Sequence, residues 1–98
     1  MKVIFINDEL EYLMFVENVW KYPQWVLKSY QKRVAELSNL ENSFDMFRLK
    51  ILDVEELKWN MRWYFSARLN KWRRLIFRIL RDWTIEIVEI CDITNHYH

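Results

Sequence analysis

The chain contains no glycine and a single proline, Pro23, among its 98 residues. Glycine is the residue that reaches positive φ without steric cost, so its absence leaves left-handed turns to Asn or Asp. The candidates are Asn7, Asp8, Asn39, Asn42, Asn60, Asn70 and Asn95. The same absence excludes the glycine-rich loops that hold nucleotide phosphates, and we expect no cofactor.

Composition and length predict one packed domain that covers residues 1–98. The hydrophobic fraction is 52% and the aromatic fraction is 17%, which is typical of a folded core. The single Cys91 cannot form an internal disulfide, as suits a reducing compartment. Asp8 interrupts the first apolar run too early for a signal peptide, and no stretch reaches membrane-spanning length. We therefore expect a cytoplasmic protein without a membrane partner.

The first half of the chain predicts one strand and a two-helix hairpin. Residues 2–6 are β-branched and aromatic, which favours a strand. A helix is predicted from Asp8 to Trp20, and a second from Pro23 to Asn39. Four positions are predicted to form the apolar edge of the second helix: Val26, Tyr30, Val34 and Leu37. Four others are predicted to face water: Lys28, Lys32, Arg33 and Glu36. Four aromatic residues of the first half are predicted to pack in the core: Phe5, Phe15, Trp20 and Trp25.

The second half predicts an antiparallel meander. From Trp59 to Asn70, apolar and polar residues alternate with the period of a strand. A turn over residues 70–72 leads into a strand from Arg74 to Leu80, and a further strand runs from Thr84 to Ile93. The fold class is therefore α+β.

Positive charge is concentrated in residues 58–81, which hold eight Lys and Arg and no carboxylate. They are Lys58, Arg62, Arg68, Lys71, Arg73, Arg74, Arg78 and Arg81. Because alternate strand residues share a face, we expect Arg62, Arg68, Arg74 and Arg78 to converge, with Lys71 and Arg73 nearby. Such a face suits a single-stranded polyanion, because guanidinium groups match phosphate oxygens. An ordinary solvated face and a surface for an acidic protein partner are the alternatives.

The chain ends in possible proton-transfer groups, His96, Tyr97 and His98. Cleaving RNA without a metal requires a base for the 2′-hydroxyl, cations for the phosphorane charge and an acid for the leaving oxygen. Since no Cys, His and carboxylate cluster has metal-ligand spacing, no metal site is predicted. RNA cleavage is the leading hypothesis.

Several short runs together resemble the HigB branch of the RelE/ParE toxin superfamily, in order and in spacing. The runs are Leu57-Lys58, Ser66 to Asn70, Arg74 to Phe77, Ile85 to Ile90, and Tyr97-His98. The resemblance implies a toxin of a type II toxin–antitoxin pair that cuts mRNA in the ribosomal A site. It also implies a cognate helix-turn-helix antitoxin, through which any contact with DNA would be indirect.

The resemblance also implies roles for individual residues. Lys58 and Arg74 match cations near the scissile phosphate, while Tyr97 and His98 match terminal proton-transfer groups. Arg68 matches a structural or phosphate-binding position. Asp92 and His96 lie near the acidic and His positions at the end of the family pattern.

The chain departs from the family pattern at two places. Trp59 and Trp63 stand where glycines are usual, and the net charge is only +1. With Trp72 and Trp83, these tryptophans are candidates for an exposed rim that contacts the antitoxin or the ribosome. Two alternative functions remain open: a ParE-like DNA gyrase poison, and a degenerate toxin that acts only as an antitoxin-binding co-repressor.

Overall fold

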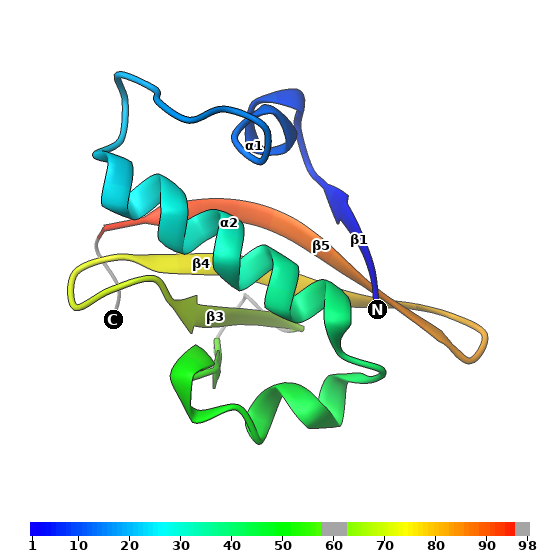
Figure 1. The fold of residues 1–98 in the computed structure, drawn as a ribbon. Coiled ribbons are helices and arrows are strands. Elements are labelled where there is room, and N and C mark those ends of the chain that lie inside the picture. The colour runs from blue at the N-terminus through cyan, green and yellow to red at the C-terminus, as the bar shows by residue number, and fades with distance from the viewer. Residues whose placement is uncertain (58–62, 96–98) are drawn as a thin grey trace.

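A five-stranded sheet with helices on one face forms the protein, and the computed structural model describes residues 1–57 and 63–95 (Figure 1). The elements are β1 (Lys2–Phe5), α1 (Asp8–Tyr12), α2 (Gln24–Asn39), the 3-10 turns η1 (Ser43–Phe47) and η2 (Lys50–Leu52), β2 (Glu55–Glu56), β3 (Tyr64–Arg68), β4 (Arg74–Asp82) and β5 (Ile85–Thr94). This architecture confirms the predicted α+β class. Within the described residues, no helix is long and apolar enough to cross a bilayer.

The strand order β1-β5-β4-β3-β2 places the first strand beside the last. Strands β3 to β5 form the predicted antiparallel meander, although β3 begins only at Tyr64, and β2 adds an antiparallel edge strand that was not predicted. In contrast, β1 pairs with β5 in parallel, from Lys2↔Ile87 to Phe5↔Ile90. This parallel pairing is possible because the chain leaves β1 through α1 and α2, which cross one face of the sheet. It then enters the sheet again at β2, on the opposite edge, and the meander returns it to β5 beside β1. Alternation within the strands did not predict this long-range pairing.

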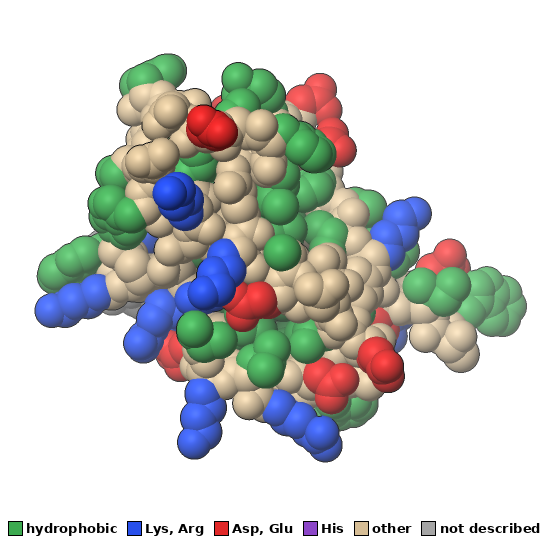
Figure 2. Space-filling view, viewed as in Figure 1, with side chains coloured by type: hydrophobic (Ala, Val, Ile, Leu, Met, Phe, Trp, Pro, Cys, Tyr) green, Lys and Arg blue, Asp and Glu red, His purple; other side chains and the backbone are tan. Residues whose placement is uncertain are grey.

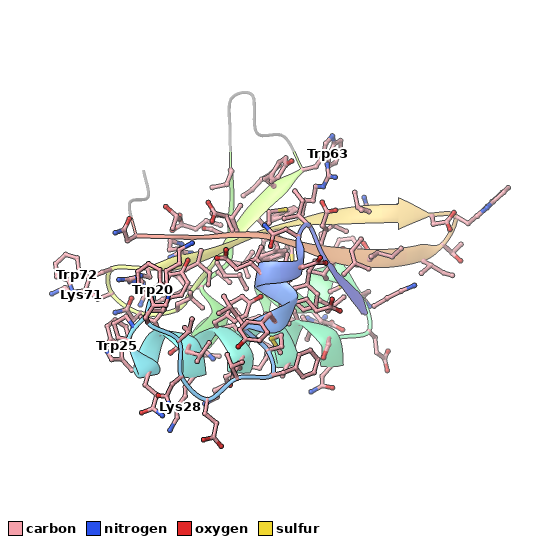
Figure 3. All side chains as sticks on the ribbon, turned by 90° about the horizontal axis from the view of Figure 1, so that it is seen from above. Trp20, Trp25, Lys28, Trp63, Lys71 and Trp72 are labelled. Carbon is pink, nitrogen blue, oxygen red and sulfur yellow. The ribbon has the colours of Figure 1, made fainter. Side chains whose placement is uncertain are left out.

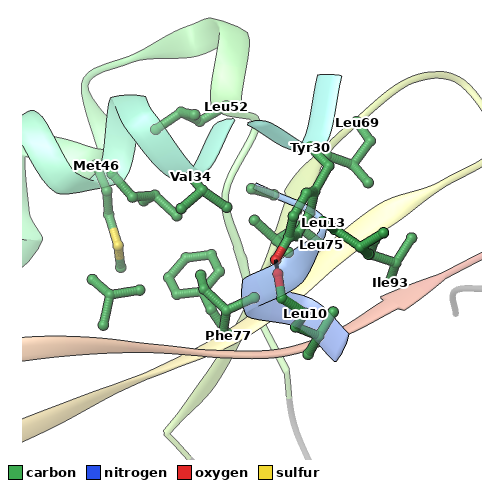
Figure 4. Close-up of a cluster of buried hydrophobic side chains, with 14 of the residues drawn as sticks. Leu10, Leu13, Tyr30, Val34, Met46, Leu52, Leu69, Leu75, Phe77 and Ile93 are labelled. Carbon is green, nitrogen blue, oxygen red and sulfur yellow. Dashed lines mark hydrogen bonds between the residues drawn. The ribbon is translucent and has the colours of Figure 1, made fainter. Parts of the chain in front are cut away.

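The core lies between α2 and the inner face of the sheet (Figure 4). The apolar edge of α2 is buried as predicted, and Phe77 on β4 is fully buried beneath it. The hydroxyl of the fully buried Tyr30 donates to the carbonyl oxygen of Leu10 at 2.6 Å. This bond fixes α1 against α2 and satisfies a carbonyl that a short helix leaves without an internal partner.

The predicted first helix is wrong in length, because α1 ends at Tyr12. The side-chain amide of Gln31 on α2 donates to the carbonyl oxygens of Leu13 and Val16, both at 2.8 Å. These long-range bonds hold the chain in an irregular path after α1. As a result Phe15 and Trp20 are 80% and 95% exposed, and the prediction that they pack in the core is wrong.

Two other side chains of the first half also differ from their predicted environments. Trp25, expected in the core, is about half exposed at the start of α2. Arg33, expected to face water, is buried. Its Nε donates to the backbone oxygen of Arg68 at 3.0 Å, so α2 is tied to the end of β3.

The left-handed turns also fall at unexpected residues. Among the described residues, positive φ occurs at Asp53, Trp63 and Trp83 rather than at the Asn candidates. Asn7 and Asn42 are extended, and each side-chain oxygen accepts backbone N–H bonds at the start of a helix or 3-10 turn. Their amide groups therefore act as caps, which requires no left-handed backbone. Asn60 lies outside the described residues.

Candidate functional site

The outer face of the sheet, opposite α2, carries three of the predicted arginines. In the β3–β4 register, Arg68 is opposite Arg74 and Tyr64 is opposite Arg78, and residues opposite each other share a face. The prediction that Arg68, Arg74 and Arg78 share one face is therefore confirmed. Arg78 is four residues from Arg74, or about 13 Å along the strand, so it is not part of the same cluster.

Asp53 joins two of these arginines at the end of η2. Arg68 donates to Oδ2 of Asp53 from Nη2 at 2.8 Å, and Arg74 donates to the same oxygen from Nη1 at 3.2 Å. Arg74 also donates from Nε to the hydroxyl of Ser66 at 2.8 Å and from Nη2 to the backbone oxygen of Asp53. We call Asp53, Ser66, Arg68 and Arg74 the arginine cluster.

The two arginines of the cluster differ in accessibility. The side chain of Arg68 is 56% exposed, whereas that of Arg74 is 10% exposed. Arg74 is thus a polar, hydrogen-bonded group beneath the surface, and Arg68 presents its guanidinium to solvent. An incoming phosphate would reach Arg68 first.

Because residues 58–81 hold no carboxylate, the sequence predicts that this face carries only positive charge, and that prediction is wrong. Carboxylates from outside residues 58–81 form ion pairs with the arginines of this face. Asp53 pairs with Arg68 and Arg74, and Glu89 pairs with Arg78 at 2.5 Å. The hydrogen bond to Glu89 raises the pKa of Arg78, whose guanidinium also lies 5.6 Å from the ring centroid of Tyr64. The sheet topology brings these acids to the face, which no local count of charges could reveal.

A further carboxylate on this face was missed from the sequence. Glu55 on β2 is exposed and lies opposite Ser66 in the β2–β3 register, so it is on the same face as the cluster. The Glu55-Glu56 pair directly before Leu57-Lys58 was the available signal. Without the short β2 strand, its place beside Ser66 could not be derived.

The remaining predicted site residues are distributed as follows. Arg74 is opposite Thr94 in the β4–β5 register, so the end of β5 lies beside the arginine cluster. Lys71 and Arg73 lie in the turn between β3 and β4, at the same end of the sheet. Asp92 is exposed on β5. Lys58, Arg62, His96, Tyr97 and His98 lie outside the described residues.

Comparison with known proteins gives a likeness of structure. The sequence matches no protein-family model and no curated protein. In fold it is similar to a YoeB/ParE toxin from Agrobacterium tumefaciens, with a TM-score of 0.58 and 17% identity over 99% of this chain and 100% of that one. It is also similar to YoeB in a YoeB–YefM complex from Staphylococcus aureus, with a TM-score of 0.55 and 24% identity over 99% and 98% of the two chains.

A YoeB dimer from Staphylococcus aureus is similar to the same degree, with a TM-score of 0.55 and 19% identity over 99% and 98% of the chains. The likeness covers nearly the whole length in each case. The protein therefore has the fold of the YoeB/ParE toxins.

Proposed function

We propose that the protein is the toxin of a type II toxin–antitoxin pair in the RelE/ParE superfamily, and that it is a metal-independent endoribonuclease. Its substrate in this proposal is mRNA on the ribosome, and a cognate antitoxin silences it. The observation that carries the proposal is the full-length likeness to YoeB/ParE toxins, together with an arginine cluster on the open face of the sheet.

Charge stabilisation is assigned to the cations. Arg68 is exposed at the cluster and would bind the phosphate directly, with Lys58 and Arg62 as further cations. Arg74 would add positive charge from behind while Ser66 and Asp53 hold its guanidinium in place. A fixed cation that needs no reorganisation is well suited to stabilise a phosphorane.

Proton transfer is assigned to His96, Tyr97 and His98, because β5 ends beside Arg74. We add Glu55 as a candidate base for the 2′-hydroxyl, since β2 places it opposite Ser66. A base on one side of the phosphate and an acid on the other is the arrangement that RNA cleavage requires.

The partner in this proposal is a helix-turn-helix antitoxin of the kind implied by the HigB-like motifs, and contact with DNA would be indirect. One similar structure is a YoeB–YefM complex, which supports a protein antitoxin for a chain with this fold. The HigB branch remains a prediction from the motifs. The cytoplasm is the compartment that this function requires.

The test of the proposal is Arg68→Gln. Loss of one donor to a transition-state charge lowers rates by about 100-fold, so we expect cleavage of ribosome-bound mRNA to fall by that order and growth arrest to be lost. Cut sites are mapped by primer extension, and melting temperature checks the fold. Arg48→Gln is the matched control, because the Arg48 side chain is 83% exposed on a different segment and should leave cleavage unchanged.

Cleavage by Arg68→Gln at a rate within twofold of the parent protein would contradict the assigned role. Arg74→Ala is a weaker test, since loss of toxicity could reflect loss of the cluster and of the fold. If expression instead breaks DNA and induces an SOS response, the ParE-like gyrase alternative replaces the nuclease. If the protein binds its antitoxin but never slows growth, the co-repressor alternative replaces the nuclease.

A further inference from the structure

Two turns at one end of the molecule each present a tryptophan next to a lysine. One is the turn that holds Trp20 and Lys21, before α2, and the other is the β3–β4 turn that holds Lys71 and Trp72. Trp20 is 95% exposed and Trp72 is 68% exposed. Exposed apolar side chains that gather into one patch mark an interaction site, whereas single exposed ones do not.

Both turns are held by specific hydrogen bonds or pairing. Val19 and Tyr22 form an antiparallel bridge, which places Trp20 and Lys21 at the tip between them. In the β3–β4 turn, the side-chain oxygen of Asn70 accepts from the backbone N–H groups of Trp72 and Arg73 at 3.0 and 2.7 Å. These contacts fix the two turns locally, so their exposed side chains sit on ordered backbone.

The two turns belong to one surface. The guanidinium of Arg73 lies over the ring of Tyr22, 5.6 Å from its centroid, and so joins the β3–β4 turn to the segment before α2. Figure 3 shows Trp20, Trp25, Lys71 and Trp72 gathered at one end of the molecule, with Lys28 on the neighbouring turn of α2 and Trp63 elsewhere. We call Trp20, Tyr22, Trp25 and Trp72 the aromatic platform.

Cations surround the platform. They are Lys21, Lys28, Lys71 and Arg73, of which Lys21 pairs with Glu9 at 2.9 Å. Within residues 1–57 and 63–95, no carboxylate lies within 4 Å of Lys28, Lys71 or Arg73. The surface therefore combines exposed rings with three cations that have no ion-pair partner among the described residues.

We propose that the aromatic platform binds single-stranded RNA, with unpaired bases stacked on the tryptophans and phosphates held by Lys71, Arg73 and Lys28. Aromatic platforms edged by cations bind single strands in this way, because every base has an aromatic face that can stack and every nucleotide carries a phosphate that a cation can hold. As a site for mRNA beyond the cleavage point, the platform rests on the proposed function. The β3–β4 turn, which carries Lys71 and Trp72, joins Arg68 to Arg74, so this part of the platform follows directly from the arginine cluster along the chain.

An acidic protein segment would use the cations but would leave the exposed ring faces without a matching group. A nucleotide uses both features, because its base stacks on a ring and its phosphate pairs with a cation. This is why RNA is the occupant we assign. A helix of a partner protein would need an apolar groove, whereas here Lys71 lies over the ring of Trp72 and Arg73 over the ring of Tyr22.

The test is binding of a fluorescein-labelled single-stranded RNA of ten nucleotides, followed by fluorescence anisotropy. We expect Trp72→Ala and Trp20→Ala each to weaken binding by about tenfold, the order of one lost stacking contact. Trp83→Ala is the matched control. Trp83 is 94% exposed at the tip of the β4–β5 hairpin, which projects from the other end of the molecule, and its loss should leave binding unchanged (Figures 1 and 2).

A second measurement isolates the charge contribution. Lys71→Gln should lower the slope of log affinity against log salt concentration by about 0.7, the contribution of one phosphate contact on a single strand. Trp72→Ala should leave that slope unchanged. Equal slopes for Lys71→Gln and the parent protein would overturn the assignment of the phosphate contact.

The outcomes separate this inference from the proposed function. If the Trp variants bind RNA as tightly as the parent protein, the platform proposal fails even where the parent cuts mRNA. If they lose binding while the parent neither cuts mRNA nor arrests growth, the platform stands and the nuclease proposal fails. Binding of a ten-residue polyglutamate peptide with the same affinity, weakened by the same variants, would overturn RNA as the occupant in favour of an acidic protein.

Discussion

The guanidinium of Arg74 is a charge whose side chain is only 10% exposed, and its neighbours explain how the fold tolerates it. Ser66 and the backbone and carboxylate of Asp53 accept its N–H groups. Asp53 can reach both arginines because its backbone is left-handed, with φ 46 and ψ 54, a region that Asp tolerates better than most residues. The stability of the site and its charge thus depend on the same carboxylate.

Asp53→Asn should therefore destabilise the protein. Asn keeps the shape and the left-handed preference, so the change removes mainly the counter-charge of Arg74. Removing one partner of a fully buried ion pair lowers the free energy of unfolding by about 3–5 kcal/mol. Removing one partner of an exposed ion pair lowers it by less than about 1 kcal/mol. Asp53 is 36% exposed, so we expect a loss of about 2 kcal/mol between these limits, measured by urea unfolding.

Asp82→Asn is the control for this change. Asp82 is exposed and, within the described residues, forms no ion pair, so its substitution should leave the unfolding midpoint in place. An unchanged midpoint for Asp53→Asn would mean that Ser66 and backbone oxygens alone suffice to hold Arg74.

At the scale of the elements, the β4–β5 hairpin is unusual for its turn. Asp82 is opposite Ile85, which leaves Trp83 and Thr84 as a two-residue turn, and Trp83 has φ 59. Two-residue hairpin turns require positive φ, and Gly or Asn normally supplies it. This chain has no glycine, so a bulky residue takes a conformation that costs about 1–2 kcal/mol.

Trp83→Gly should stabilise the hairpin. The substitution relieves the left-handed strain and removes a side chain that is 94% exposed, so little packing is lost. Allowing for the greater flexibility of glycine in the unfolded chain, we expect a gain of about 0.5–1 kcal/mol, seen as a melting temperature a few degrees higher.

The same change at Trp72 tests the reason. Trp72 is also exposed in a hairpin turn but has no positive φ. Trp72→Gly should therefore lower the melting temperature, because only the entropic cost of glycine remains. A gain of the same size at both positions would show that loss of an exposed tryptophan, rather than relief of strain, is the cause.

At the scale of the whole molecule, the 3-10 turn η1, between α2 and β3, is tied to the sheet at both of its ends. Ser43 at the start of η1 donates to Glu86 on β5 from its amide at 2.7 Å and from its hydroxyl at 2.6 Å. At the other end, the ring of Phe47 meets Phe65 on β3 edge-on, at 6.1 Å between centroids. These contacts position η2 and Asp53 at the arginine cluster.

The contact with Glu86 predicts a pH dependence of stability. Burial raises the pKa of Glu86, but hydrogen bonds from Ser43 and the charge of Arg81 lower it more, so the pKa lies below its ordinary value of 4.5. The stabilisation is therefore complete above that value and is lost as the pH falls through the lowered pKa of the folded protein.

Glu86→Gln checks this dependence by urea unfolding at pH values from about 7 down to about 3. The parent protein should be the more stable at neutral pH, and its advantage over the variant should shrink below about pH 4.5. Ser43→Ala keeps the carboxylate but removes the hydroxyl bond, so it should lose part of the same dependence. An advantage over Glu86→Gln that stays constant to the lowest pH would contradict the lowered pKa.

Local periodicity was enough to predict much of the fold. The alternation of apolar and polar residues predicted that Phe65 and Ala67, and Leu75, Phe77 and Ile79, are inward, and all five lie on the core face. Trp63 belongs to the same alternation but is 65% exposed, so the prediction is wrong at that residue. The spacing from Val26 to Leu37 predicted the buried edge of α2. The same alternation placed the arginines of β3 and β4 on the outer face, so the candidate site was foreseen in part.

The errors have two physical origins, which are contacts between distant segments and the geometry of a tight turn. Gln31 ends the first helical segment by binding carbonyls 15 and 18 residues earlier, which leaves Phe15 and Trp20 in solvent. Trp83 has positive φ because two strands must be joined by two residues, whatever those residues are. Neither outcome is encoded in the residues beside it.

The amino-acid order alone therefore determined β1, β3, β4, β5 and the second helix, and the face that residues within these strands occupy, because those depend on the repeat of the backbone over a few residues. It did not predict the short strand β2. Only the tertiary structure decided that Asp53 meets Arg74 and Arg68, residues 21 and 15 positions away, and that two Trp-Lys turns form one surface. Which charges are paired and which rings are exposed depends on which distant segments meet in the folded protein. The burial of apolar surface over the whole molecule decides which segments meet.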